Sequence, residues 1–161
     1  MGLGRAPTPE EIAAWDIDVD PTGAGLPPGR GGVDQGRELF KVRCAACHGL
    51  AGEGGLGPKL IGREPATGFA EDPKIERTIG NWWPYATTVF DYVRRAMPQT
   101  QPGSLTDDEV YALVAFLLHE NGAAPDGFVA DAESVRAVKM PTRVTFFPDD
   151  RPGAGVPELR R

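Results

Sequence analysis

The sequence has few of the residues that metal clusters and disulfide frameworks require. Among its 161 residues it contains two cysteines and two histidines. A structural zinc site needs about four ligands, and His119 lies far along the chain from His48. This inventory argues against a zinc site built on the two cysteines.

Long apolar runs and an excess of positive charge are also missing. No run approaches the length that spans a bilayer, so we expect no membrane span. The 17 basic and 23 acidic residues give a net charge of −6, which argues against nucleic acid or an anionic membrane as partner. It favours docking onto a basic protein surface, with a merely soluble acidic surface as the alternative.

What the sequence does contain is the segment Cys44-Ala45-Ala46-Cys47-His48. Two cysteines three residues apart, followed by a histidine, are the attachment signature of a c-type haem. On one helical turn both cysteines share a face, where each can form a thioether with a haem vinyl group. The histidine lies on that face and can bind the iron as proximal ligand. The motif predicts one covalent haem c and an electron carrier; a redox thiol pair or a disulfide is the alternative.

Composition and periodicity divide the chain into three parts. Residues 1–32 and 123–161 are predicted as irregular arms, because they are rich in proline or glycine and show little periodicity. Such arms are suited to wrapping a partner, with flexible tails as the alternative. Residues 33–122 are predicted as the compact haem domain.

Four helices are predicted from capping signals and apolar spacing. A capping box at Thr8 indicates a short first helix, and Asp34 can cap the helix that leads into the haem motif. Residues 84–95 carry apolar side chains at helical spacing. A second capping box at Thr106 opens a strongly apolar helix that stops at Asn121.

This order of motif, glycine-rich loop and helices resembles the class I cytochrome c family over about residues 33–122. The resemblance implies an all-α class I cytochrome c fold, with about three to five helices around one covalent haem. In this family the first and last helices cross at a glycine/aromatic contact. Here that contact would join Gly36 and Phe40 to the region of Tyr111, Val114 and Ala115.

The glycine-rich loop, residues 49–62, matches the family pattern G-P-x-L at Gly57, Pro58 and Leu60. The resemblance implies that the Pro58 carbonyl accepts the Nδ1 proton of His48, which fixes the tautomer and makes the other nitrogen a better iron ligand. It also implies that Leu60 packs on the haem face. An ordinary turn is the alternative for this stretch.

The family presents its distal thioether ligand from a segment between the middle and last helices, where this chain has Met97. A His/Met pair fills the iron coordination and suits electron transfer. Met97 as a core residue is the alternative. Met140, also followed by proline, is a competitor for the ligand position, and His119 is expected at the surface.

Five side chains near Met97 are candidates for binding the haem propionates. Cytochromes of this class often use tryptophan, tyrosine and arginine for this purpose, because a buried carboxylate needs paired donors. The candidates are Trp82, Trp83, Tyr85, Arg94 and Arg95. The alternative places both tryptophans in the core and both arginines in solvent.

A closer resemblance spans residues 7–19, 81–98, 102–111 and 138–141. These segments are similar to the cytochrome subunit of sulfane dehydrogenase (SoxD) of bacterial sulfur oxidation and to related sulfite dehydrogenases. The resemblance implies an electron-transfer subunit rather than an enzyme. It would accept electrons from a molybdenum-containing sulfur dehydrogenase and pass them to an acceptor such as another cytochrome. Some members carry a second haem domain, but one motif here predicts one haem.

Two other functions remain open at this point. One is a free, diffusible periplasmic cytochrome that serves several donors. The other is a haem catalyst such as a peroxidase, against which a methionine in the sixth position argues. Thioether attachment takes place outside the cytoplasmic membrane, so we expect an exported, periplasmic protein whose signal peptide is absent from this sequence.

Overall fold

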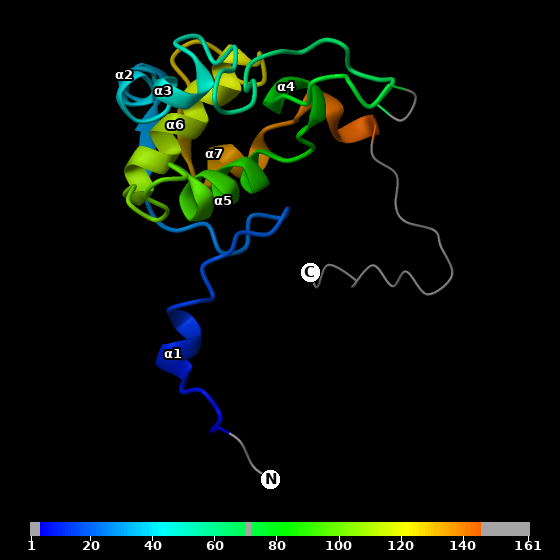
Figure 1. Cartoon of the computed structure of the whole chain (residues 1–161). Helices are drawn as coiled ribbons and strands as arrows, with labels where there is room; N and C mark the ends of the chain where they lie inside the picture. Colours follow the sequence, from blue (N-terminus) through cyan, green and yellow to red (C-terminus); the bar gives the residue numbers. More distant parts are fainter. Residues whose placement is uncertain (1–3, 70–71, 146–161) are drawn as a thin grey trace, which may run out of the picture.

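The computed structural model describes residues 4–69 and 72–145 and is mostly helical (Figure 1), which confirms the predicted all-α class. The long helices are α2 (Val33–Arg43), α5 (Ala86–Ala96) and α6 (Asp107–Glu120). Shorter elements are α1 (Pro9–Ala13), α3 (Ala45–His48), α4 (Ile79–Trp82), α7 (Ala132–Ala137) and a 3-10 helix at Pro141–Thr145. Within the described residues, no helix is long and apolar enough to cross a bilayer.

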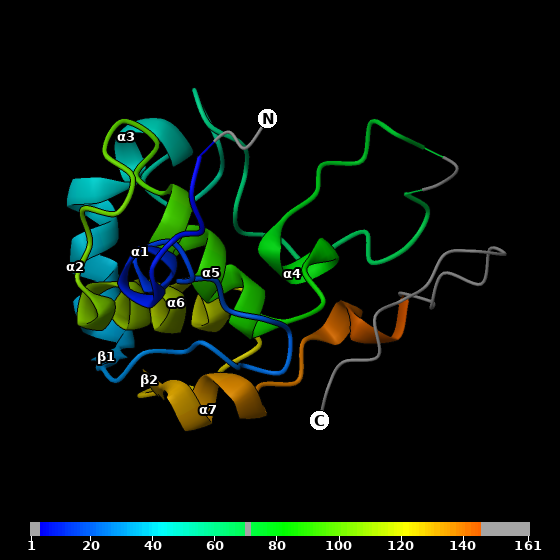
Figure 2. The ribbon, with the colours of Figure 1, turned by 90° about the horizontal axis from the view of Figure 1, so that it is seen from below.

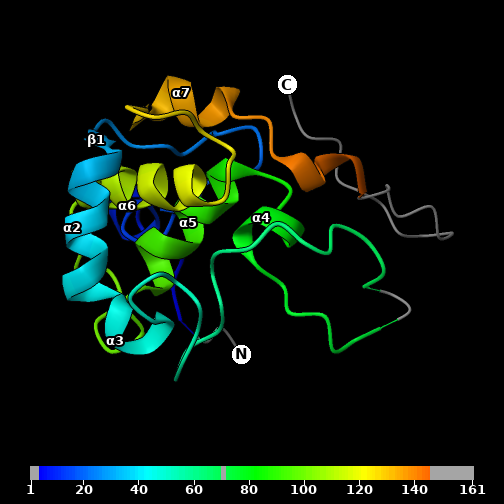
Figure 3. The same cartoon turned by 90° about the horizontal axis from the view of Figure 1, so that it is seen from above.

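Helix α6 is the centre of the molecule. Every side chain from Val110 to Leu118 is buried, and a helix that is apolar all round belongs in a core. The predicted capping box is present, since the Thr106 hydroxyl accepts the N–H of Glu109 and the Glu109 carboxylate accepts the N–H of Thr106. Helices α2 and α5 flank α6, while α7 runs along another side (Figures 2 and 3).

Helices α2 and α6 cross with almost no space between their backbones. A Cβ atom on Gly36 would overlap the carbonyl oxygen of Ala112 and lie 2.8 Å from the Cβ of Phe116. Beside this contact, the rings of Phe40 and Phe116 have centroids 5.1 Å apart. The glycine/aromatic crossing that the family resemblance implies is therefore present.

The nearest partners of Gly36 and Phe40 lie within the region of α6 that was expected. The crossing uses Ala112 and Phe116, which lie four residues apart and so share one face of the helix. Tyr111 lies one position away and turns to α5, where its ring packs 4.5 Å from Phe90. Its hydroxyl donates a hydrogen bond to the carbonyl of Pro27.

The start of α2 differs from the expectation that Asp34 caps it. Gly32 is the N-cap residue, and Asp34 lies within the first turn. The reason is that a strand, β1 (Arg30–Gly32), runs directly into the helix. The N–H of Val33 bonds to the carbonyl of Phe128, so the backbone enters the helix straight from strand pairing.

The two predicted arms meet each other on the body of the domain. Strand β1 pairs antiparallel with β2 (Val129–Asp131), with Gly31 opposite Ala130. Val19, Val135 and Met140 are buried in the same core as α6. The division at residues 32 and 122 stays a prediction, but these parts of both arms are packed, and residues 146–161 lie outside the described part.

Substituting Gly36 by alanine tests the helix crossing. The added methyl group would collide with backbone of α6, so we expect Gly36→Ala to lower the free energy of unfolding by roughly 3 kcal/mol. Urea denaturation of the holoprotein measures this. Gly32→Ser is the matched control, because its Cβ would have 4.0 Å of clearance and serine caps helices well. Equal stability of both variants would contradict the account.

Candidate haem site

Cys44, Cys47 and His48 lie on a single turn at the end of α2. Cys44 is the N-cap residue of α3, and the N–H of His48 bonds to its carbonyl at 3.0 Å. Both thiols are free, with Cys44 half-buried and Cys47 exposed. Helix α3 lies at the end of α2 that is remote from the β1–β2 sheet (Figures 2 and 3). The turn therefore presents two thiols and one imidazole together at the surface.

The two thiols have different surroundings. Burial raises the pKa of the Cys44 thiol to about 11, and the positive charge of Arg43 opposes this shift. With this pKa, the free Cys44 thiol is almost entirely protonated at neutral pH. Because the thiolate is the reactive form, Cys44 is less reactive in the free protein than its ordinary pKa would make it. Cys47 is the more accessible sulfur.

The imidazole of His48 is held in one tautomer. Its Nδ1 lies 2.7 Å from the carbonyl oxygen of Pro58. A carbonyl oxygen only accepts hydrogen bonds, so Nδ1 carries the proton and Nε2 keeps the lone pair that a metal needs. This is the contact that the family resemblance implies.

Glycine allows the loop to approach the imidazole. A Cβ on Gly57 would lie 2.8 Å from Cε1 of His48, closer than a side chain tolerates. The loop is also tied to α3 by its backbone, since the N–H of Gly57 bonds to the carbonyl of Cys47 and the N–H of Gly54 to that of His48, both at 2.8 Å. These contacts fix the position of Pro58 relative to the histidine.

A buried asparagine connects the same loop to the end of α6. Asn121 is fully buried, and its Oδ1 accepts the N–H of Gly62 at 3.0 Å. Its Nδ2 donates to the carbonyls of Leu117 at 2.8 Å and Leu60 at 3.3 Å. The sequence marked Asn121 only as a helix stop, because nothing local shows that its side chain reaches back 59 residues.

Leu60 and Met97 are both half-buried. Leu60 packs against the hydrophobic core, while Met97 is the C-cap residue of α5 and its N–H bonds to the carbonyl of Val93 at 3.2 Å. Met140, by contrast, is one of the buried core residues. Among the three methionines, Met97 is thus the one at a helix end with a partly open side chain, while Met1 lies outside the described residues.

The predicted tryptophans take part in aromatic contacts. The ring of Trp82 meets that of Phe69 edge-on at 4.9 Å, and the guanidinium of Arg77 lies over it at 4.4 Å. Trp83 meets Tyr92 edge-on at 5.7 Å. Both tryptophans are half-buried, and their binding of a propionate stays a prediction.

The predicted arginines are bound to partners within the chain. Arg94 donates to Asp107 and to the carbonyl of Ile17, both at 2.9 Å. Arg95 makes a two-pronged pair with Asp91, whose nearer contact is 2.5 Å. Both guanidinium groups are thus engaged by acceptors that the sequence did not indicate, and a propionate role for either stays a prediction.

The donor set fits a c-type haem. Cys44 and Cys47 have free thiols that can form thioethers, and the lone pair of His48 is at Nε2. Gly57 leaves room for the loop beside the imidazole ring. Within residues 4–69 and 72–145, no group of three or more histidine, cysteine or acidic side chains is arranged to hold a metal ion.

Comparison with known proteins decides the family. Residues 31–117 match the family model described as cytochrome c oxidase, cbb3-type, subunit III. The chain belongs to the cytochrome c family. A cytochrome c domain implies haem c, and electron transfer is the role that this family fits.

One solved structure resembles this cytochrome over its whole length. A chain in the crystal structure of the sulfane dehydrogenase SoxCD from Paracoccus pantotrophus is 44% identical, with a TM-score of 0.82. The match covers 100% of this cytochrome and 78% of that chain. It confirms the class I cytochrome c fold and the resemblance to the sulfane dehydrogenase subunit.

Curated relatives match about half of this chain. A thiosulfate dehydrogenase from Psychrobacter arcticus is 31% identical over 54% of this cytochrome and 25% of its own length. A cytochrome named cyt cy from Rhodobacter capsulatus is 33% identical over 46% of this chain and 37% of its own length. This chain thus spans a quarter to little more than a third of these relatives.

The role of Asn121 can be tested by removing its hydrogen bonds. We expect Asn121→Leu to lower the free energy of unfolding by about 1–3 kcal/mol, because three backbone groups lose a buried partner. Hydrogen exchange of the Gly62 amide should become about tenfold faster in the variant than in the wild type, when both are measured relative to amides within α6. Gln101→Leu, at an exposed position, is the control. Unchanged Gly62 protection in Asn121→Leu would contradict this role.

Proposed function

We propose that this cytochrome is the electron-transfer subunit of a molybdenum-dependent dehydrogenase for sulfur compounds, with sulfane sulfur or sulfite as substrate class. The observation that carries the proposal is the 44% identity over the full chain to a component of sulfane dehydrogenase SoxCD. Similarity to the thiosulfate dehydrogenase from Psychrobacter arcticus, although partial, points to the same class of substrate.

The chain's own residues would hold a single haem c. Cys44 and Cys47 supply the thioethers and His48 the proximal nitrogen, oriented by the Pro58 carbonyl. When bound, the haem supplies one-electron redox chemistry. One attachment motif in the sequence supports one haem.

We assign the sixth ligand to Met97. Its side chain is partly open at the end of α5, whereas Met140 is buried in the core beside α7. A thioether in this position would fill the coordination of a bound haem iron and raise its potential, which favours electron transfer over reaction with peroxide. The role of the chain is then to bind, orient and shield the haem, with no substrate chemistry of its own.

The partners follow from the proposed role. The donor is the molybdenum-containing subunit, and the acceptor is another carrier such as a second cytochrome. With a net charge of −6, the cytochrome suits docking onto basic protein surfaces. Covalent haem attachment places the working protein in the periplasm.

A free, diffusible carrier is the second candidate. The similarity to cyt cy supports a general carrier, because that protein's name refers to a cytochrome c and to no dehydrogenase. The two candidates differ in whether the protein forms a stable complex with a dehydrogenase.

Reduction of the cytochrome in a mixture tests the proposal. The oxidised holoprotein is combined with the molybdenum subunit of a sulfane or sulfite dehydrogenase, substrate is added, and the absorbance of reduced haem is followed. We expect fast reduction that requires both subunit and substrate. Absence of reduction, while ascorbate reduces the same sample, would refute the subunit role and leave a general carrier.

A further inference from the structure

The N-terminal arm displays apolar side chains that the body of the protein does not cover. Helix α1 has no buried residue. Ile12 is 50% exposed, Trp15 88% and Ile17 40%, and we refer to these three residues as the arm patch. A five-residue helix is not stable alone in water, and a nearly fully exposed tryptophan is typical of a binding anchor.

The base of the arm is fixed, so the arm patch has a defined place. The N–H of Val19 donates to Oδ1 of Asp91 at 2.9 Å, and Val19 itself is buried. Arg94 donates to the carbonyl of Ile17 at 2.9 Å. Helix α5 thereby holds the arm two residues from Trp15, and Figure 1 shows α1 projecting away from the body of the protein.

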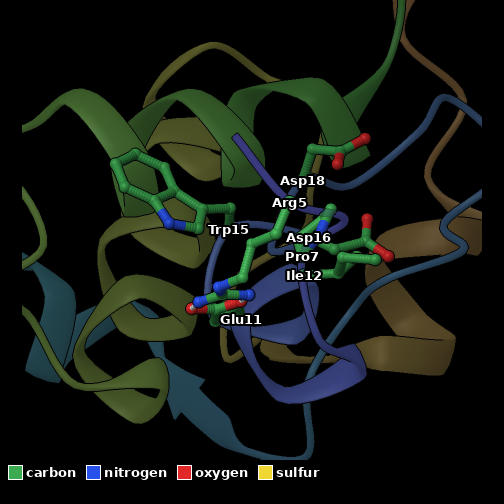
Figure 4. Close-up of a pocket in the computed structure, with 7 residues that line it drawn as sticks. All are labelled: Arg5, Pro7, Glu11, Ile12, Trp15, Asp16 and Asp18. Carbon is green, nitrogen blue, oxygen red and sulfur yellow. Dashed lines mark hydrogen bonds and ion pairs between the residues drawn. The ribbon is translucent and has the colours of Figure 1, made fainter. Parts of the chain in front are cut away.

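A wide, open hollow lies along the arm, between its helix and the segment that leads to Val19. Figure 4 shows Trp15 on one side of the ion pair between Arg5 and Glu11, with the aspartates on the other side. The hollow is about 930 Å³, enough for several side chains of a partner. It is lined by Arg5, Pro7, Glu11, Ile12, Trp15, Asp16 and Asp18.

The chain segment that carries the arm patch is acidic, although Arg5 and Arg94 contact it. Residues 6–29 contain five acidic residues and no lysine or arginine. Glu11 is paired with Arg5, while Asp16 and Asp18 flank Ile17. A complementary partner surface would therefore be basic, with an apolar pocket for the tryptophan.

We propose that the arm patch is the docking site for the molybdenum-bearing subunit, with the Trp15 side chain inserted into an apolar pocket that basic residues border. The inference rests on the proposed function and adds to it the anchoring surface. It is supported by the match to the sulfane dehydrogenase chain, which covers 100% of this protein and so includes the arm. An arm held at its base loses little conformational entropy when it docks.

Trp15→Ala in the holoprotein is the direct test. Because the side chain is 88% exposed, its removal should leave the haem spectrum and the unfolding midpoint unchanged. We expect binding to the molybdenum subunit, measured by isothermal titration calorimetry, to weaken about 30-fold. Val42→Ala, which removes another exposed apolar side chain (79% exposed) on α2, should bind as the wild type does.

Haem reduction separates docking from electron transfer. In Trp15→Ala the subunit concentration for half-maximal rate should rise by the same factor, while the rate at saturation stays that of the wild type. Combining Asp16→Asn with Asp18→Asn should slow association at low salt and flatten its salt dependence.

The outcomes against the proposal are distinct. If the wild type is reduced by the subunit and Trp15→Ala binds equally well, the docking site is wrong while the proposed function stands. If the wild type is not reduced at all, the proposed function is wrong, and the docking site that rests on it is rejected with it. If sedimentation shows that the wild type dimerises alone and Trp15→Ala does not, the arm patch binds a second copy of the chain, which overturns the assignment.

Discussion

The orientation of the His48 imidazole depends on a loop that has little structure of its own. The hydrogen bond from Nδ1 to the Pro58 carbonyl exists because Gly57 lets the loop lie against the ring. Backbone bonds to α3 hold one side of the loop, and the amide of Asn121 holds the other. His48, the loop and the last helix therefore form one connected unit, and the loss of any contact in it would disturb the orientation of the imidazole that we propose binds the iron.

Helix α6 links this unit to the rest of the fold. At the beginning of α6, Asp107 accepts a hydrogen bond from Arg94 of α5. In the middle, Ala112 and Phe116 pack against α2. Just after its end, Asn121 accepts a hydrogen bond from the loop. The stability of the domain and the geometry of the site thus share the same helix. The close approach at Gly36 fixes how α2, and with it the attachment turn, lies on α6.

Local signals predicted the local structure well. The capping boxes at Thr8 and Thr106 mark α1 and α6, because both partners of each box lie within four residues. The pairing of β1 with β2 could not be predicted, since it joins segments about 100 residues apart that carry no periodicity. The hydrogen-bond partners of Arg94 and Asn121 could not be predicted for the same reason: they are set by tertiary packing and not by neighbours in the sequence.

The axial pair is the central claim, and methionine methyl resonances test it directly. In reduced, diamagnetic holoprotein labelled with ¹³C at the methionine methyl groups, the methyl group of a methionine whose sulfur binds the iron would lie over the haem ring and shift strongly upfield. The account predicts one such signal, lost in Met97→Leu and retained in Met140→Leu. A shifted signal that disappears in Met140→Leu instead, or no shifted signal in the wild type, would contradict the assignment of Met97 opposite His48.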